Sequence, residues 1–253
     1  MRKSTLLGFL SSSLLLTTLL TSCVDDSHLT AEPPIPDQSF VEEFDTANSA
    51  YARGWRYINK SVALGRRNWQ NPNADNYIPF QPYSTYAAGN GYLWADYQST
   101  SSASGVISNW AVSPQVWMKN GDKIIFYTRT ELYSFNGDST DFVNRMQVRI
   151  NPTGSLNCGE GTDPGDFTTT LVDINPFYYE FLLNDYNIAN PNDPDRIKAR
   201  NAYPHRWTRY EATVFGLSKP VQGRFAFRYF VEGAGSNGFG SSVGIDSVAY
   251  ISK

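Results

Sequence analysis

The stretch Arg224-Phe225-Ala226-Phe227-Arg228-Tyr229-Phe230-Val231 indicates the fold class. It follows Gln222-Gly223, and its aromatic and β-branched side chains are typical of a β-strand. Neighbouring side chains of a strand point to opposite faces, so Arg228 is expected to face away from Phe227 and Tyr229. If that face is buried, the Arg228 charge is expected to pair with a carboxylate.

Other segments along the chain have the same β character. Met146 to Ile150 alternates cleanly between apolar and polar residues and ends at Asn151-Pro152, a turn starter. Further strands are expected at Phe40–Asp45, Lys123–Thr128, Phe167–Ile174, Trp207–Phe215 and Val243–Ile251. Strands separated by turn signals, without a βαβ rhythm, predict one antiparallel all-β sandwich.

Helical signals are weak. No stretch shows sustained apolar spacing of 3.6 residues, and the best helical candidate is Pro176 to Leu183. That segment could equally be a loop that packs on the sandwich. The polar, proline-containing segment from Asn184 to Pro204 is interpreted as a long surface loop.

Composition narrows the function classes. The 253 residues suit one large domain, and 15% aromatic residues with a net charge of −3 exclude global disorder. Two cysteines exclude a disulfide framework, and together with two histidines they exclude histidine-rich metal sites and zinc ribbons. A pI near 5.4 argues against a nucleic-acid partner.

The first 38 residues are interpreted as a targeting signal followed by a tether. Residues 1–22 have the basic start and apolar stretch of a signal peptide, and Leu20-Thr21-Ser22-Cys23 resembles a bacterial lipobox. This resemblance implies lipidation of Cys23, so the membrane is contacted through a lipid anchor only. Residues 23–38, with three prolines, are expected to form a flexible tether. Val24-Asp25-Asp26 resembles a surface-export signal of Gram-negative lipoproteins, which implies the outer membrane and the cell surface.

A series of short motifs resembles a known family. The series runs through Phe40-Val41-Glu42-Glu43-Phe44-Asp45, Arg53-Gly54-Trp55, Trp110-Ala111-Val112-Ser113-Pro114, Arg145-Met146-Gln147-Val148, Tyr203-Pro204 and Gly244-Ile245-Asp246-Ser247-Val248. In this order the motifs resemble the choice-of-anchor J domains of bacterial surface proteins, which are similar to cleaved-adhesin domains. The resemblance implies a single jelly-roll β-sandwich of the galactose-binding-like kind over residues 39–253. It also implies adhesion or glycan binding far more often than catalysis.

The same resemblance implies a structural calcium ion. Jelly rolls of this kind commonly tie the first strand to the last with such an ion, which points to Glu43, Asp45 and Asp246. Calcium prefers six to eight hard oxygen ligands, and carboxylates supply them. The alternative is that Asp246 caps a turn and Glu43 is a solvated strand residue.

Aromatic side chains in a polar stretch are the candidates for glycan binding. These are Tyr83, Tyr86, Tyr92, Trp94 and Tyr97. Flat rings can stack on the C–H groups of a sugar while neighbouring polar groups bind its hydroxyls. The alternative is that the rings fill the core, since aromatic side chains dominate core packing.

These observations favour a surface lipoprotein with an adhesin-like domain that binds a glycan or a host matrix protein. The alternative is a non-catalytic structural or accessory subunit of a surface complex. A hydrolase is less favoured, because His205 is the one plausible catalytic base and no Gly-x-Ser-x-Gly motif frames a nucleophile. We therefore expect no enzymatic activity.

The lipid anchor generates the first prediction. Cys23→Ser should release the protein into the soluble fraction while leaving its thermal unfolding unchanged, because the tether separates the anchor from the fold. Membrane fractionation at high salt measures this. A variant that stays with the membranes would contradict lipidation at Cys23.

Overall fold

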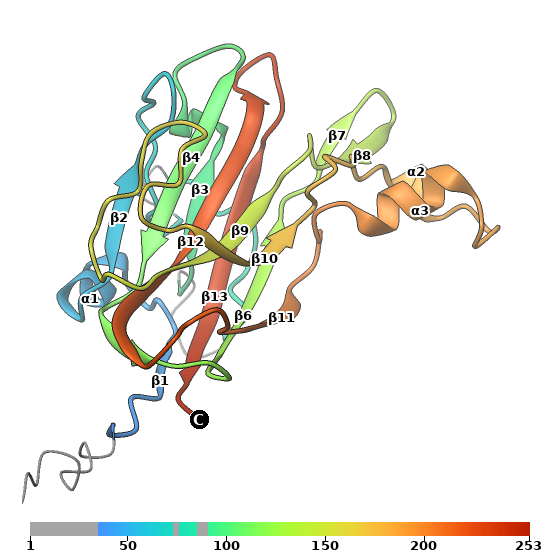
Figure 1. Ribbon diagram of the computed structural model, residues 1–253. Coiled ribbons are helices and arrows are strands. Elements are labelled where there is room, and N and C mark those ends of the chain that lie inside the picture. Colours follow the sequence, from blue (N-terminus) through green and yellow to red (C-terminus); the bar gives the residue numbers. More distant parts are fainter. Residues whose placement is uncertain (1–34, 73–75, 85–90) are drawn as a thin grey trace, which may run out of the picture. The chain divides into compact units, whose positions relative to one another are not determined.

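The strand containing Arg224–Val231 lies in the middle of a six-stranded antiparallel sheet (Figure 1). This strand, β12, extends from Val221 to Ala234. The order is β10-β9-β12-β4-β2, and β5 pairs with the beginning of β12. The bounds are β2 Arg56–Asn59, β4 Gly105–Val112, β5 Val116–Met118, β9 Met146–Asn151 and β10 Thr169–Ile174.

The second sheet has five strands. Its order is β1-β13-β6-β11, and β3 also pairs with β13. The bounds are β1 Phe40–Glu42, β3 Leu93–Asp96, β6 Lys123–Thr130, β11 Thr208–Thr213 and β13 Ser242–Ile251. Every pairing in both sheets is antiparallel.

One apolar core joins the two sheets. Phe225, Phe227 and Tyr229 of β12 are fully buried, and the Phe227 ring meets the Phe126 ring of β6 at 4.9 Å. Trp55 is also buried, with its ring 5.7 Å from that of Phe225. Burying each such side chain stabilises the fold by about 1.5–3 kcal/mol. Because two antiparallel sheets pack over one shared apolar core, the predicted all-β jelly-roll sandwich is confirmed.

Short elements decorate the sandwich. They are helix α1 Ala47–Ala52, the 3₁₀ turn η2 Tyr97–Ser99, strands β7 Tyr133–Phe135 and β8 Asp138–Thr140, and helices α2 Leu183–Tyr186 and α3 Pro194–Asn201. Strands β7 and β8 form a separate two-stranded hairpin.

Two helical expectations need correction. Residues 176–182 form a loop that packs on the sandwich, with Phe181 buried, so the loop alternative holds there. The segment interpreted as a surface loop contains α2 and α3 instead. The side chain of Asp193 caps α3 by accepting from the Asp195 N–H at 3.0 Å, and Pro194 occupies its first turn. Proline at that position favours a helix start, because an N–H group there would have no acceptor within the helix.

Arg228 is buried, as its position facing away from Phe227 allows, but the expected carboxylate partner is wrong. None of the ion pairs between described residues includes Arg228. Its guanidinium donates to the Gly161 carbonyl at 2.6 Å and to Ser108 Oγ at 3.0 Å. It also lies 3.9 Å from the centre of the Phe230 ring. Burial lowers the pKa of Arg228 to about 9. Carbonyl dipoles and aromatic faces, in place of a carboxylate, stabilise its positive charge.

The computed structural model describes residues 35–72, 76–84 and 91–253. The predicted signal peptide, Cys23 and most of the tether lie outside these residues, as does Tyr86. Gln38, the last residue of the predicted tether, accepts a hydrogen bond from the Trp117 N–H at 2.8 Å. Within the described ranges, no helix combines the length and the apolarity needed to cross a bilayer.

Candidate functional site

An aromatic depression lies near the turn between β12 and β13. Two adjoining hollows of about 470 and 320 Å³ share Tyr97 and Tyr133 as walls, and we call them together the aromatic groove. The larger hollow is also lined by Phe135, Phe142 and the turn at 235–241. The smaller one is lined by Arg66, Arg67, Tyr77, Trp94, Asp96 and Gln98. Volumes of this size match small-ligand sites in proteins.

The rings of the groove are both exposed and braced. Phe135 is 54% exposed, Tyr77 42% and Tyr97 37%. The hydroxyls of Tyr133 and Tyr77 donate to the two oxygens of the Glu131 carboxylate, the first at 2.7 Å. Burial, and then the hydrogen bond to Glu131, raise the pKa of Tyr77 to about 12. Both phenols therefore stay protonated at neutral pH and remain fixed to one anchor.

Polar groups stand beside these rings. Gln98 Oε1 accepts from Arg66 Nε at 3.0 Å; Arg66 is exposed and Gln98 half-buried at the smaller hollow. Asp96 is buried; its carboxylate accepts from Arg67 Nε at 3.1 Å and from the Gln98 N–H at 2.9 Å. The groove thus combines flat apolar faces with hydrogen-bonding groups, which is the pairing that sugars require.

The five aromatic residues predicted as ligand contacts separate in the structure. Tyr97 lines both hollows and is exposed, and Trp94 lines the smaller one but is only 3% exposed. Tyr92 is fully buried against Phe80, which corrects the expectation for this ring. Tyr83 is exposed but stacks on Tyr127 at 3.6 Å and lines neither hollow. Tyr86 is not among the described residues.

Sequence reasoning missed the rings of the hairpin. Tyr133 and Phe135 occupy alternate positions just before Asn136-Gly137, a pair that favours a tight hairpin turn. This signal could have identified the β7–β8 hairpin and its two rings on one face. Phe142 follows the hairpin, and its ring lies 5.5 Å from that of Phe135.

A second polar centre joins the first strand to the last. β1 pairs with β13 from Phe40↔Tyr250 to Glu42↔Val248, and β3 pairs with β13 from Ser242 to Ile245. Between these two partners β13 has a bulge at Asp246 and Ser247, where Ser247 has a φ of 49°. Asp246 lies near Glu43, as expected: the Glu43 charge acts on the Asp246 carboxyl, and the hydroxyl of the adjacent Ser247 donates to Glu43 Oε1 at 3.3 Å.

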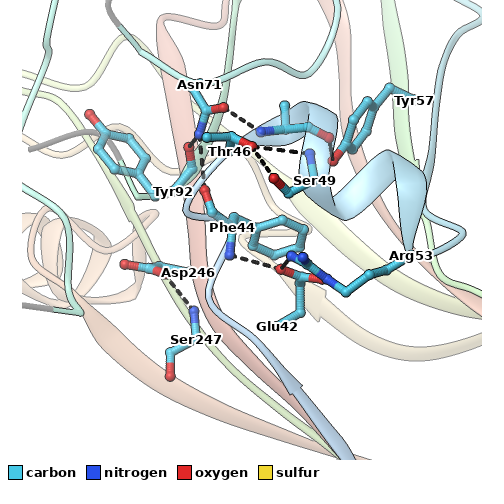
Figure 2. A network of polar contacts seen from close by, with 11 residues as sticks. Glu42, Phe44, Thr46, Ser49, Arg53, Tyr57, Asn71, Tyr92, Asp246 and Ser247 are labelled. Carbon is cyan, nitrogen blue, oxygen red and sulfur yellow. Dashed lines mark hydrogen bonds and ion pairs between the residues drawn. The ribbon is translucent and has the colours of Figure 1, made fainter. Parts of the chain in front are cut away.

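Backbone groups already hold the Asp246 carboxylate. Its Oδ2 accepts from the N–H groups of Tyr83 and Ser84 at 2.8 and 3.1 Å, and its Oδ1 accepts from Ser247 at 2.7 Å. Figure 2 shows Asp246 beside Ser247, near the network in which buried Glu42 binds Arg53 and the Phe44 N–H. Burial raises the pKa of Asp246 to about 7, despite these three donors.

The three expected calcium ligands are only partly assembled. Asp246 Oδ1 accepts a single N–H, and Glu43 Oε2 is buried without a hydrogen-bond partner among the described residues. These two oxygens could still bind a hard cation. Asp45 is exposed, and its charge acts on Arg53 instead. Within the described ranges, no three acidic, histidine or cysteine side chains are grouped to hold a metal.

Comparisons with known proteins give structural matches only. No family model and no curated protein matches the chain. Among solved structures, the K1 cleaved adhesin domain of Lys-gingipain from Porphyromonas gingivalis W83 has a TM-score of 0.48 and 17% identity, covering 85% of this chain and 98% of that one. The K3 cleaved adhesin domain of the same protein has a TM-score of 0.48 and 14% identity, with coverage of 87% and 100%. TmCBM61 in complex with β-1,4-galactotriose has a TM-score of 0.37 and 8% identity, with coverage of 83% and 96%.

The buried Asp246 generates a pH prediction. The native state keeps the proton between the unfolded pKa near 3.8 and the folded pKa of about 7, whereas the unfolded chain releases it. The free energy of unfolding should therefore fall as pH rises from 4 to 7, by up to about 4 kcal/mol from this group. Asp246→Asn should flatten this slope in urea unfolding curves, whereas Asp45→Asn, at an exposed position, should not. Equal slopes in the wild type and in Asp246→Asn would contradict the assignment.

Proposed function

We propose that the protein is a non-catalytic carbohydrate-binding protein whose aromatic groove holds a glycan. The observation that carries this proposal is the set of exposed rings around Tyr97 and Tyr133, braced by Glu131 and flanked by polar side chains. Rings that are fixed before binding lose little conformational entropy when a ligand stacks on them. The groove supports binding of a neutral sugar chain without any rearrangement of its walls.

The acidic groups at the groove argue for binding over hydrolysis. A glycosidase needs two carboxyl groups that act on the scissile bond. Here the Asp96 carboxylate is occupied by Arg67 and the Gln98 N–H, and Glu131 is occupied by two tyrosine hydroxyls. Both acids therefore act as braces of the groove walls.

Attachment to the cell surface completes the proposal. A lipidated Cys23 and the following tether would present the sandwich at the outer membrane, where a glycan or matrix protein of the surroundings is the natural partner. The alternative, an accessory subunit of a surface complex, predicts a protein ligand on the same exposed rings. Glycan arrays on the purified full chain separate these two proposals, because only the first requires retention of a saccharide.

Tyr97 provides the direct test of the groove. Tyr97→Ala should weaken binding of an array-identified oligosaccharide about tenfold, or ~1.4 kcal/mol, because the ring forms a wall of both hollows. Titration calorimetry measures the change. Tyr51→Ala is the matched control, since Tyr51 is 52% exposed on α1 and lines neither hollow. Equal affinities of the two variants would refute the groove as the binding site.

We further propose that calcium binds where β13 changes partner. The support is the pair of available oxygens, Glu43 Oε2 and Asp246 Oδ1, with other oxygens supplied by backbone or water. The ion would neutralise two carboxylates that otherwise repel each other.

Calcium should raise the melting temperature at pH 7, because a ligand bound only by the native state stabilises it by about 2.7 kcal/mol at 100 times its Kd. Glu43→Gln should abolish this response, and magnesium serves as the ion control. An unchanged melting curve with calcium and with a chelator would remove the ion from the proposal and leave the groove untouched.

A further inference from the structure

A separate cavity lies between α3 and β11, away from the aromatic groove. It has a volume of about 250 Å³, and its walls include Phe181, Tyr186, Arg200, His205, Arg206 and Tyr210. None of its lining residues lines either hollow of the groove. Its volume is below the range typical of drug-sized ligands, so it suits one small group such as a single sugar residue.

Aromatic rings form a fixed wall of this cavity. The His205 ring lies 4.3 Å from the Phe181 ring and 5.3 Å from the Tyr186 ring. The Arg200 guanidinium lies over the Tyr186 ring, 4.5 Å from its centre. A guanidinium that lies over an aromatic ring can still donate its N–H groups to a ligand.

Cations without an acidic partner gather here. Neither Arg200 nor Arg206 takes part in any ion pair between the described residues. Arg129 binds the carbonyl oxygen of His205 at 2.9 Å and adds a third positive charge nearby. Burial, then Arg206 and Arg129, lower the pKa of His205, so the field at this ring is positive.

Other arginines differ in their partners. Arg53, Arg67, Arg145 and Arg209 each have a carboxylate partner, whereas Arg149 and Arg228 are held by carbonyl oxygens. The protein as a whole carries a net charge of −3. The nearby acid Asp195 is occupied by Lys198 at 2.9 Å. Burial, and then the charges of Asp195, Asp138 and Asp193, raise the pKa of Asp185, next to Tyr186. Arg200 and Arg206 are both exposed at the aromatic cavity, so their guanidinium groups are available to an anionic ligand.

We propose that this cavity binds the anionic group of an acidic sugar, with the sugar ring against the aromatic wall. The guanidinium groups of Arg200 and Arg206 would donate paired hydrogen bonds to a carboxylate or sulfate, a geometry that the planar fork of arginine matches. Phe181 and Tyr186 would cover the apolar face of the ring. The site is independent of the aromatic groove, so each proposal can fail alone.

The test compares charged and neutral saccharides on the purified full chain. Titration calorimetry would use trigalacturonate, its methyl ester, a sulfated galactan tetrasaccharide and inorganic sulfate. Trigalacturonate should bind at least about tenfold more tightly than its ester, because hydrogen bonds to a charged group are the stronger ones. The sulfated probe shows whether sulfate substitutes for carboxylate.

Matched variants test whether the acidic saccharide binds in this cavity. Arg200→Gln with Arg206→Gln should abolish the preference for the acid over the ester, whereas Arg209→Gln, at an exposed β11 residue that does not line the cavity, should preserve it. The single variant Arg206→Gln keeps the test available if the double variant unfolds, and it should reduce the preference by a smaller factor.

Results of two kinds would overturn the proposal. One is equal affinity for the acid and its ester, or an unchanged preference in the double variant. The other is binding of inorganic sulfate as tight as that of every acidic saccharide, which would reveal a site for a free anion with no sugar contact.

Discussion

The five-stranded sheet depends on how β13 divides its hydrogen bonds. One side of β13 pairs with β6, whereas the other side pairs first with β3 and then with β1. The bulge at Asp246 and Ser247 lies where the partner changes, and the Asp246 carboxylate there collects three backbone N–H groups. A buried carboxylate thus connects the last strand with residues 83–84 and brings it beside Glu43. The bulge shifts the register of β13 against β6 at the point where pairing with β3 has ended and pairing with β1 has not yet begun.

The aromatic groove is built at the ends of the long strands β12 and β13. β12 and β13 are joined by the turn at 235–241, which forms one wall of the larger hollow, and η2 follows directly after β3 to place Tyr97 beside it. The β7–β8 hairpin supplies the opposite rings. Glu131 lies just before this hairpin and ties Tyr133 to Tyr77 from a distant segment. The groove is therefore part of the framework, in contrast to a site built on one loose loop.

How much of the fold and of the site could be predicted depends on whether a feature is set by neighbouring residues or by residues far apart in the sequence. Strand alternation in Met146–Ile150 and Arg224–Val231 is local, so the sandwich followed from the sequence. The proximity of Asp246 and Glu43 came from a family resemblance. Exposure of Tyr83, Tyr92 and Tyr97 could not be predicted, since identical rings are sorted by partners far away in sequence, such as Tyr127 and Phe80. The carbonyl partners of Arg228 were equally invisible, because no sequence pattern marks a loop backbone that turns its oxygens inward.

The polar groups around Arg228 replace the water molecules that would hydrate an exposed guanidinium. The oxygen of Gly161 and the hydroxyl of Ser108 provide Arg228 with the coordination that water gives an exposed guanidinium. The same segment, through Phe167 and Thr168, supplies carbonyl oxygens to Arg149. The backbone segment from Gly161 to Thr168 thus stabilises two charges on the outer face of the six-stranded sheet. Lifting this segment would break its hydrogen bonds to both arginines and expose the apolar contact between Phe167 and Trp110, so we expect the segment and the sheet to unfold together.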